Sequence, residues 1–250
     1  MKRTWTFTDI EFFSAWDRTQ KDLLPYPFTY VSTIEFADDH QREMLRAWER
    51  LRDRWGMDLD DLLADIGRPD IRIEVSGSGG GLPDRLRMVA ARREDRGYLI
   101  RQRPEGFTVT EHTAVGLAEA VVAALPESAA GRHEAITLVN QKSSEDIDFY
   151  HGMSRVQDSP EGTVAGQSEW FLNAPTSGTG TVVVVQGWSR FGPRGVARRT
   201  LTWRDLTDDG RYVVRPGKPS TATGADAQRF VALLNTEIVN VVRTIKDERA

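Results

Sequence analysis

Residues 182–203 read VVVVQGWSRFGPRGVARRTLTW. They begin the last third of the chain, and the pattern of this third decides the fold. The valine run and residues 196–203 are two extended candidates, joined by a turn that contains glycine and proline. Residues 211–214, RYVV, are a third candidate after a polar turn, and an amphipathic helix is expected over about 223–246. Runs of β-branched and aromatic residues bounded by turn residues are typical of strands. The last third of the chain therefore predicts strand, strand, strand and helix.

The first half of the chain repeats this order. Its strand candidates are residues 71–75, 86–90 and 98–100, with a short edge candidate at 107–109. A helix that Pro126 ends is expected over 113–125. The predicted buried face of this helix comprises Val115, Ala118, Val121, Val122 and Leu125. We therefore predict two related halves, 1–130 and 131–250, that share one sheet as a single structural unit, with internal duplication as a hypothesis.

The N-terminal region predicts a short strand, three helices and a second strand. Thr8 and Glu11 form a capping-box pattern, which begins the first helix. Residues 28–36 alternate between two sides of an extended chain and are predicted to form a strand. Two more helices are expected after it, one that ends at Gly56 and one over about 59–66.

Composition excludes several classes of protein. The chain has 250 residues, of which 39% are hydrophobic and 28% charged, as in a soluble globular protein. The formal net charge of −4 argues against a nucleic-acid-binding protein, which usually carries an excess of Lys and Arg. Cysteine is absent, so the chain has no disulfide, no thiolate nucleophile and no cysteine metal ligand.

Targeting and membrane segments are not evident in the sequence. No run approaches the roughly 18–20 apolar residues that a membrane helix needs, and the N-terminus lacks the apolar stretch of a signal peptide. We therefore expect a cytoplasmic protein without membrane insertion. Only five of the 33 basic residues are lysine, an arginine bias that is typical of GC-rich genomes such as those of actinobacteria.

A catalytic or cofactor motif is also not evident. The glycine-rich run at 77–81 lacks the Lys-Ser/Thr pair of a phosphate loop, and Leu82-Pro83 follows it instead of a helix start. The four histidines are scattered, and no nucleophile elbow occurs. Asp205, Asp208 and Asp209 are most simply turn residues before Gly210. We therefore predict that the protein is not an enzyme and holds no cofactor and no metal.

Several short motifs are similar to those of one known family. Trp203-Arg204-Asp205 is followed by Gly210-Arg211-Tyr212, and Gly97-Tyr98-Leu99-Ile100 precedes a helix that ends in Ala-Leu-Pro at 124–126. In these residues the chain resembles the EspG family, cytosolic chaperones associated with type VII (ESX) secretion in mycobacteria and other actinobacteria. The match is imperfect, because Leu206 interrupts the Asp-Thr pair that the family typically has after the tryptophan.

The resemblance implies a fold, a partner and a binding surface. The implied fold is α+β, with a central, mostly antiparallel sheet flanked by two helical groups in a quasi-two-fold arrangement. The implied partner is a secreted helical-hairpin protein of PPE type, already paired with a PE protein, and no catalysis is implied. By position, a loop of Gly77, Gly79, Gly80, Gly81 and Leu82 and the apolar residues Trp170, Phe171, Leu233 and Val239 are candidates for binding this partner. The plain alternative is that the loop is a mobile turn and that the apolar residues belong to the core.

Two other functions remain open from the sequence. One is a small-molecule enzyme or ligand-binding protein, with a site between the halves that uses residues such as Asp205, Arg211 and Arg190. The other is a structural homodimer that uses a sheet edge or the final helix. The arginines at 190, 194, 198 and 199 form a basic cluster, for which a solvated strand edge is the default interpretation.

Overall fold

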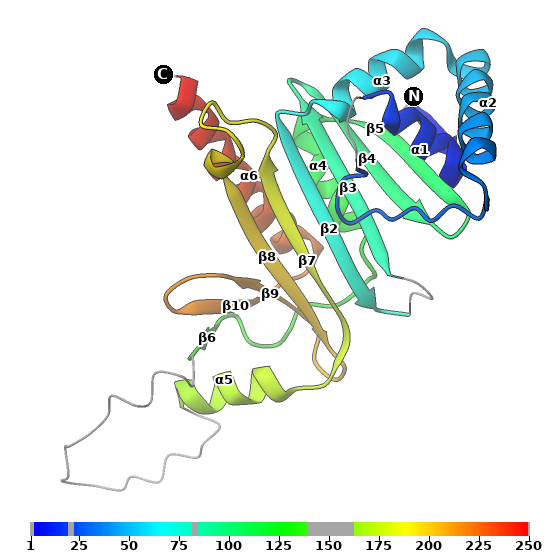
Figure 1. The fold of residues 1–250 in the computed structure, drawn as a ribbon. Coiled ribbons are helices and arrows are strands. Elements are labelled where there is room, and N and C mark those ends of the chain that lie inside the picture. The colour runs from blue at the N-terminus through cyan, green and yellow to red at the C-terminus, as the bar shows by residue number, and fades with distance from the viewer. Residues whose placement is uncertain (1–2, 20–22, 82–84, 140–162, 250) are drawn as a thin grey trace, which may run out of the picture.

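The computed structural model describes residues 3–19, 23–81, 85–139 and 163–249. Within these ranges, one ten-stranded antiparallel sheet forms the centre of the protein (Figure 1). The first half supplies β1 (Thr4–Phe7), β2 (Ile71–Gly79), β3 (Leu86–Arg93), β4 (Arg96–Arg103) and β5 (Gly106–Thr113). The second half supplies β6 (Ile136–Leu138), β7 (Thr176–Gln186), β8 (Arg198–Leu206), β9 (Arg211–Arg215) and β10 (Ser220–Gly224).

Six α-helices in the described residues cover this sheet. They are α1 (Asp9–Asp17), α2 (Ala37–Trp55), α3 (Met57–Gly67), α4 (Leu117–Ala123), α5 (Val164–Asn173) and α6 (Ala227–Arg249), with 3₁₀ turns at Ala114–Gly116 and Pro193–Gly195. None of these helices is both long enough and apolar enough to cross a membrane. The α+β prediction is confirmed.

The strand order is symmetric about the central pair β2–β7. The order is β1-β5-β4-β3-β2-β7-β8-β9-β10-β6, so β3 corresponds to β8, β4 to β9, β5 to β10 and β1 to β6. Each half consists of four consecutive strands followed by a helix, α4 or α6, with one further strand at the outer edge. The duplication of an ancestral half, and the boundary at residue 130, stay predictions.

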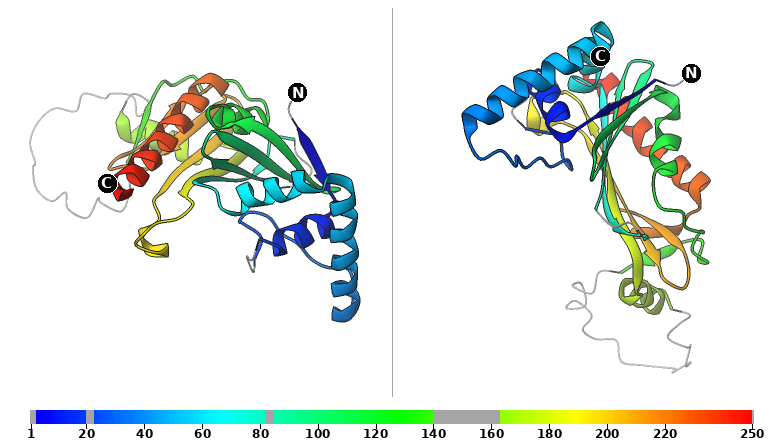
Figure 2. Two further views of the ribbon diagram at one scale, coloured as in Figure 1. Left: turned by 90° about the horizontal axis from the view of Figure 1, so that it is seen from above. Right: turned by 90° about the vertical axis from the view of Figure 1, so that its right-hand side faces the viewer.

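Helices lie on both faces of the sheet (Figure 2). On one face, α4 and α6 pack against the central strands and enclose a core that includes Val184, Trp203 and Phe230. On the other face of the first half, α1, α2 and α3 enclose a core that is rich in aromatic side chains, with Phe12 stacked on Phe107 at 4.0 Å between ring centroids. A third and smaller core lies between α5 and the strands β6, β9 and β10.

The predicted elements of the second half are present with shifted bounds. The valine run lies inside β7, residues 196–203 lie largely in β8, and RYVV opens β9. Helix α6 begins at Ala227, where the backbone N–H of Arg229 donates to the carboxylate of Asp226 at 2.7 Å. The start expected at about residue 223 was therefore wrong, because Thr223 and Gly224 end strand β10, which was not predicted.

Two predictions in the first half were also wrong. Residues 28–34 alternate in burial as predicted, but Phe36 is 65% exposed. The segment pairs with no strand in the part of the chain that the structure describes and crosses beside helices α1 and α2 instead. Tyr30 stacks on Phe13 of α1 at 4.4 Å and shares a hydrogen bond with His40 of α2, so contact with helices replaces a strand ladder. Val115 is 84% exposed, because it lies in a 3₁₀ turn, whose tighter winding rotates it off the buried face of α4.

Candidate partner-binding surface

The glycine-rich run at 77–81 is half strand and half turn. Gly77 lies within β2, opposite Gly180 of β7, and the ring of Trp203 lies across this pair. A Cβ atom at Gly77 would lie 2.6 Å from that ring, and one at Gly180 would lie 2.0 Å from it. The prediction that Gly77 belongs to a loop was therefore wrong, since Gly77 and Gly180 make room for a core tryptophan. Gly77 is a packing residue and does not belong to an exposed loop.

The turn between β2 and β3 begins at the next glycines. Gly79, Gly80 and Gly81 all have positive φ angles, of 85°, 68° and 76°, which side chains disfavour. The backbone N–H of Gly80 donates to the carbonyl oxygen of Ser177 at 2.7 Å, which fixes the turn beside the start of β7. A side chain at Gly81 would meet no atom within 4 Å, so this position faces open space. Leu82 lies outside the described residues.

Helix α5 lies at the same end of the sheet as this turn (Figure 1). Its C-terminus is held by Arg204 of β8, whose guanidinium donates to the carbonyl oxygens of Phe171 at 2.8 Å and of Ala174 at 3.0 Å. A cation at this position satisfies carbonyl groups that the helix leaves unpaired and complements the helix dipole. Burial lowers the pKa of Arg204. These hydrogen bonds from β8 therefore hold helix α5 against the second half of the sheet.

Three large apolar side chains of α5 are exposed to solvent. Val164 is 55% exposed, Leu172 48% and Trp170 41%. The Trp170 ring contacts the ring of His133 edge-on at 5.0 Å, beside a notch of about 220 Å³ that Pro175 and Asp209 also line. We call Val164, Trp170, Leu172 and the turn Gly79–Gly81 the α5 end. Val164 and Leu172 lie about 80° apart around α5, whereas Trp170 lies at least about 120° from both, beside the notch. The α5 end therefore presents exposed apolar side chains on two sides of the helix.

The other apolar candidates do not belong to this surface. Phe171 is 1% exposed and packs against Tyr212 in the third core, so its assignment to a partner groove was wrong. Leu233 of α6 packs against the main core, and Val239, six residues further, is 47% exposed. Six residues correspond to about 120° of rotation around a helix, so Leu233 and Val239 lie on different sides of α6. Sequence reasoning missed Val164 and Leu172, although the apolar cluster at 170–172 in a polar region was visible.

The residues proposed for a small-molecule site do not meet between the halves. Asp205 and Arg211 form a bidentate ion pair at 2.7 and 2.8 Å, with exposed fractions of 4% and 3%. Arg211 also donates to the carbonyl oxygen of Pro126 at 2.8 Å, so its donors are used within the protein. Arg190 lies at the other end of β7 and donates to the carbonyl oxygen of Glu248. The Asp205–Arg211 pair is therefore structural, and it connects the two halves through the carbonyl oxygen of Pro126.

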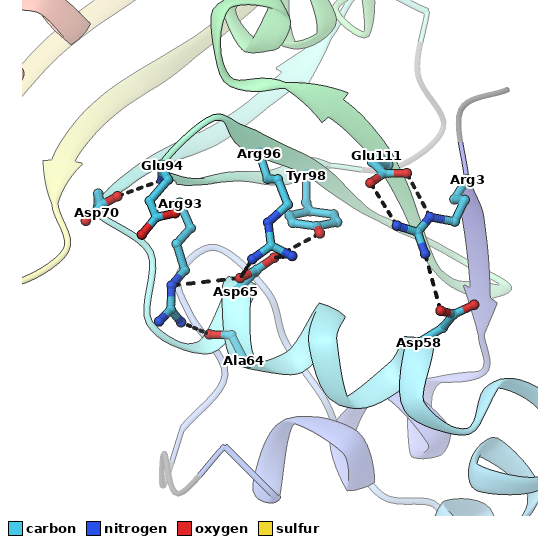
Figure 3. Close-up of polar contacts among 10 residues, drawn as sticks. All are labelled: Arg3, Asp58, Ala64, Asp65, Asp70, Arg93, Glu94, Arg96, Tyr98 and Glu111. Carbon is cyan, nitrogen blue, oxygen red and sulfur yellow. Dashed lines mark hydrogen bonds and ion pairs between the residues drawn. The ribbon is translucent and has the colours of Figure 1, made fainter.

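A second polar cluster joins helix α3 to the sheet (Figure 3). The buried carboxylate of Asp65 accepts from the hydroxyl of Tyr98 at 2.9 Å and from the guanidinium of Arg96 at 3.0 Å. Arg3, just before β1, bridges Glu111 of β5, at 2.9 and 3.2 Å, and Asp58 at the start of α3, at 3.3 Å. These carboxylates are occupied by partners from neighbouring elements, so the cluster positions α3 on the sheet.

Tyr98 makes the stability of the protein sensitive to alkaline pH. Burial, followed by the hydrogen bond to Asp65, raises the pKa of Tyr98 to about 12, from an ordinary value of about 10. The folded state therefore holds a proton that the unfolded state releases above about pH 10, and stability falls between about pH 10 and pH 12. We expect Tyr98→Phe to lose about 1 kcal/mol near pH 8 but to show a shallower decline above pH 10. Urea unfolding at a series of pH values measures both effects, and an unchanged decline in the variant would contradict them.

The comparisons with known proteins identify a family. The model of the EspG family matches residues 8–236, which is most of the chain. The chain belongs to the EspG family. No curated protein sequence matches it.

A solved structure shares the fold of this EspG-family chain. It is that of the Mycobacterium tuberculosis type VII secretion system chaperone EspG5 in complex with the PE25-PPE41 dimer. The likeness covers 99% of this chain and 96% of that chain, with a TM-score of 0.51 and 12% sequence identity. At this identity the likeness shows the fold, and the sheet with its two groups of helices is thereby confirmed as the EspG arrangement.

Proposed function

We propose that this protein is a chaperone that binds a helical type VII secretion substrate, of the PPE type paired with a PE protein, and keeps it soluble for export. The observation that carries the proposal is membership of the EspG family together with the fold of EspG5, which was solved in complex with PE25-PPE41. The exposed apolar side chains of the α5 end supply a surface that suits such a partner. We further propose that the protein acts in the cytoplasm and catalyses no reaction.

The chemistry of the α5 end fits the apolar tip of a helical hairpin. An amphipathic helix is commonly bound by laying its apolar face against an apolar surface with a polar rim. Trp170 and Leu172 provide exposed apolar area on two sides of α5, and Arg132 and Asp209 beside the notch provide a polar rim next to Trp170. The turn Gly79–Gly81 has backbone conformations that only glycine adopts freely, so it can approach a partner closely without side chains.

The small-molecule alternative has less support in the geometry. A groove of about 1100 Å³ lies beside α4 and is open to solvent, whereas a deep pocket between the halves was expected for an enzyme. Asp205 and Arg211, the residues proposed for that role, already form a buried ion pair with each other. Binding of a protein partner is therefore the function that the structure supports best.

Capture of a partner from the native cytosol tests the proposed function. The tagged protein would be purified from its own organism, and the proteins that accompany it would be identified by mass spectrometry. Stoichiometric recovery of a helical-hairpin secretion substrate is expected. Recovery of the protein alone, from cells that express such substrates, would contradict the proposal.

Substitutions at the α5 end test which surface is used. Trp170→Ala together with Leu172→Ala is expected to weaken partner binding by at least about 30-fold, because large aromatic and aliphatic anchors at an interface centre carry about 2 kcal/mol or more. Both side chains are substantially exposed, so folding should be preserved. The matched control is Phe191→Ala, which removes a 65% exposed aromatic side chain from the β7–β8 loop at the other end of β7. Isothermal titration with a purified substrate measures the affinities, and equal losses in both variants would contradict the assignment.

A further inference from the structure

A groove lies on the first half, between helix α4 and strand β5. It has a volume of about 1100 Å³ and is open along its length. Its apolar wall consists of Ala120 and Ala123 of α4 and of Ala124, which follows the helix, and it is also lined by Leu99 and Arg101 of β4. Thr108 and Thr110 of β5 contribute hydroxyl groups on the opposite side. The groove is built from other elements than the α5 end, so it is a separate surface.

Arg101 is a half-buried cation whose charge nothing in the described residues neutralises. Its neighbour on the same face of β4 is Arg103, a second cation. Burial lowers the pKa of Arg101, and the charge of Arg103 lowers it further, with no carboxylate acting in the opposite direction. Among residues 3–19, 23–81, 85–139 and 163–249, Arg101 forms no ion pair. A half-buried charge without a partner is costly, so its presence needs an explanation.

The second half of the sheet shows the same position with its partner in place. Leu99 and Val213 both face the main core, and each pairs with a threonine on the next strand, Thr110 or Thr223. Two residues further along, Arg101 of β4 pairs with Thr108, and Arg215 of β9 pairs with Thr221. Arg101 and Arg215 therefore occupy corresponding positions in the two halves.

A helix supplies the counterion of Arg215. Its guanidinium meets the carboxylate of Glu237 of α6 at 3.1 Å, and Glu237 is only 5% exposed. Helix α6 has 23 residues and reaches this position, whereas α4 has seven and is followed by Pro126. Among the described residues of the first half, no helix carboxylate forms an ion pair with the arginine, although Glu119 of α4 lines the same groove, together with Asp95 and Glu111.

We propose that the groove between α4 and β5 binds a helix of a partner protein that presents a glutamate or aspartate side chain to Arg101. Small apolar residues of the same helix would pack against the alanine wall of α4, as in other helix-in-groove interfaces. Arg103 and the hydroxyl of Thr108 complete a set of donors around the carboxylate, whereas the hydroxyl of Thr110 already contacts His112 at 2.9 Å. A free anion would stay largely solvated in so open a groove, whereas a helix would also shield Arg101 from water. The proposal does not rest on the proposed chaperone function.

A synthetic acidic helix tests this proposal. The probe is a fluorescein-labelled peptide of Ala, Leu and Glu, about 15 residues long, so that it is helical in isolation, and its matched control carries Gln for Glu. Fluorescence anisotropy with the full-length protein should show at least about tenfold tighter binding of the Glu peptide. Arg101→Met should abolish this preference. Equal binding of the two peptides, or a preference that survives in Arg101→Met, would overturn the proposal.

Thermal unfolding separates this role from a structural one. Arg101→Met keeps the length of the side chain and removes only an unpaired charge, so its Tm should equal or exceed that of the wild type. The matched substitution Arg215→Met leaves Glu237 buried without its cation and should lower Tm. A fall in Tm for Arg101→Met as large as that for Arg215→Met would show that Arg101 is structural and would overturn the proposal.

Two further outcomes would assign the groove to another occupant. If inorganic phosphate competes with the peptide at comparable concentrations, and this depends on Arg101, the groove is a site for a small anion and the helix proposal is wrong. If sedimentation shows a dimer that Arg101→Met dissociates, the occupant is a second copy of this chain, and the proposal of a different partner protein is wrong. A monomer that binds the Glu peptide and ignores phosphate supports the proposal.

Discussion

Asp205→Ala is expected to lower the free energy of unfolding by about 3–5 kcal/mol, because it leaves the guanidinium of Arg211 buried without a counterion. Both groups are almost completely shielded from water, and their two hydrogen bonds of 2.7 and 2.8 Å are the main interaction of each. Arg211 also holds the carbonyl oxygen of Pro126, so the substitution weakens the connection between the halves as well. Urea unfolding followed by tryptophan fluorescence measures the loss.

Two further variants show whether the loss of stability comes from the buried guanidinium of Arg211 that is left without a counterion. Asp208→Ala, in the turn that follows β8, changes an exposed carboxylate and should alter stability by less than about 0.5 kcal/mol. The double substitution Asp205→Leu with Arg211→Met removes both charges and should recover much of the stability, as replacements of buried ion pairs by apolar residues often do. A double variant that is less stable than Asp205→Ala would contradict this account.

Trp203→Ala is expected to cost about 3–5 kcal/mol, the range found for the truncation of a large buried aromatic side chain. The ring is 2% exposed and lies against Gly77 and Gly180, with Phe230 of α6 at 6.4 Å between ring centroids. The glycines cannot fill the space that the ring leaves, so a cavity remains between β2, β7 and α6. Chemical unfolding measures the loss. The matched control is Trp188→Ala, where the side chain is 75% exposed and the expected change is below about 0.5 kcal/mol. Similar losses in both variants would contradict the role of Trp203 as a core residue.

The elements that the sequence predicted are those with strong local patterns. The capping box of Thr8 and Glu11 is present with both of its hydrogen bonds, and the valine run is a central strand. Strand β10 has the sequence STATG, in which only Ala222 is apolar, so it has no local pattern and exists because β9 and β6 pair with it. Residues 28–36 have the pattern of a strand without a strand partner, since alternation reports which side chains are buried and not what buries them.

The candidate binding surface was less predictable than the fold. Trp170 and Phe171 are neighbours in the sequence, yet one is exposed and the other is core, because only their positions around α5 distinguish them. Gly77 and Gly81 look alike in the sequence, but Gly77 accommodates a ring from β8, some 126 positions away, and Gly81 lies in an exposed turn. The groove beside Arg101 depends on the difference in length between α4 and α6, so it became visible only when the two halves were compared in the structure.

Reconstitution of the complex tests the central claim most directly. The protein would be co-expressed with a PE–PPE pair encoded in its own genome, and the mixture would be separated by size-exclusion chromatography with light-scattering detection of mass. The account predicts one soluble species whose mass equals the sum of the three chains, and insoluble substrate when the protein is omitted. Elution of the protein alone, with the solubility of the PE–PPE pair unchanged by its presence, would contradict the account.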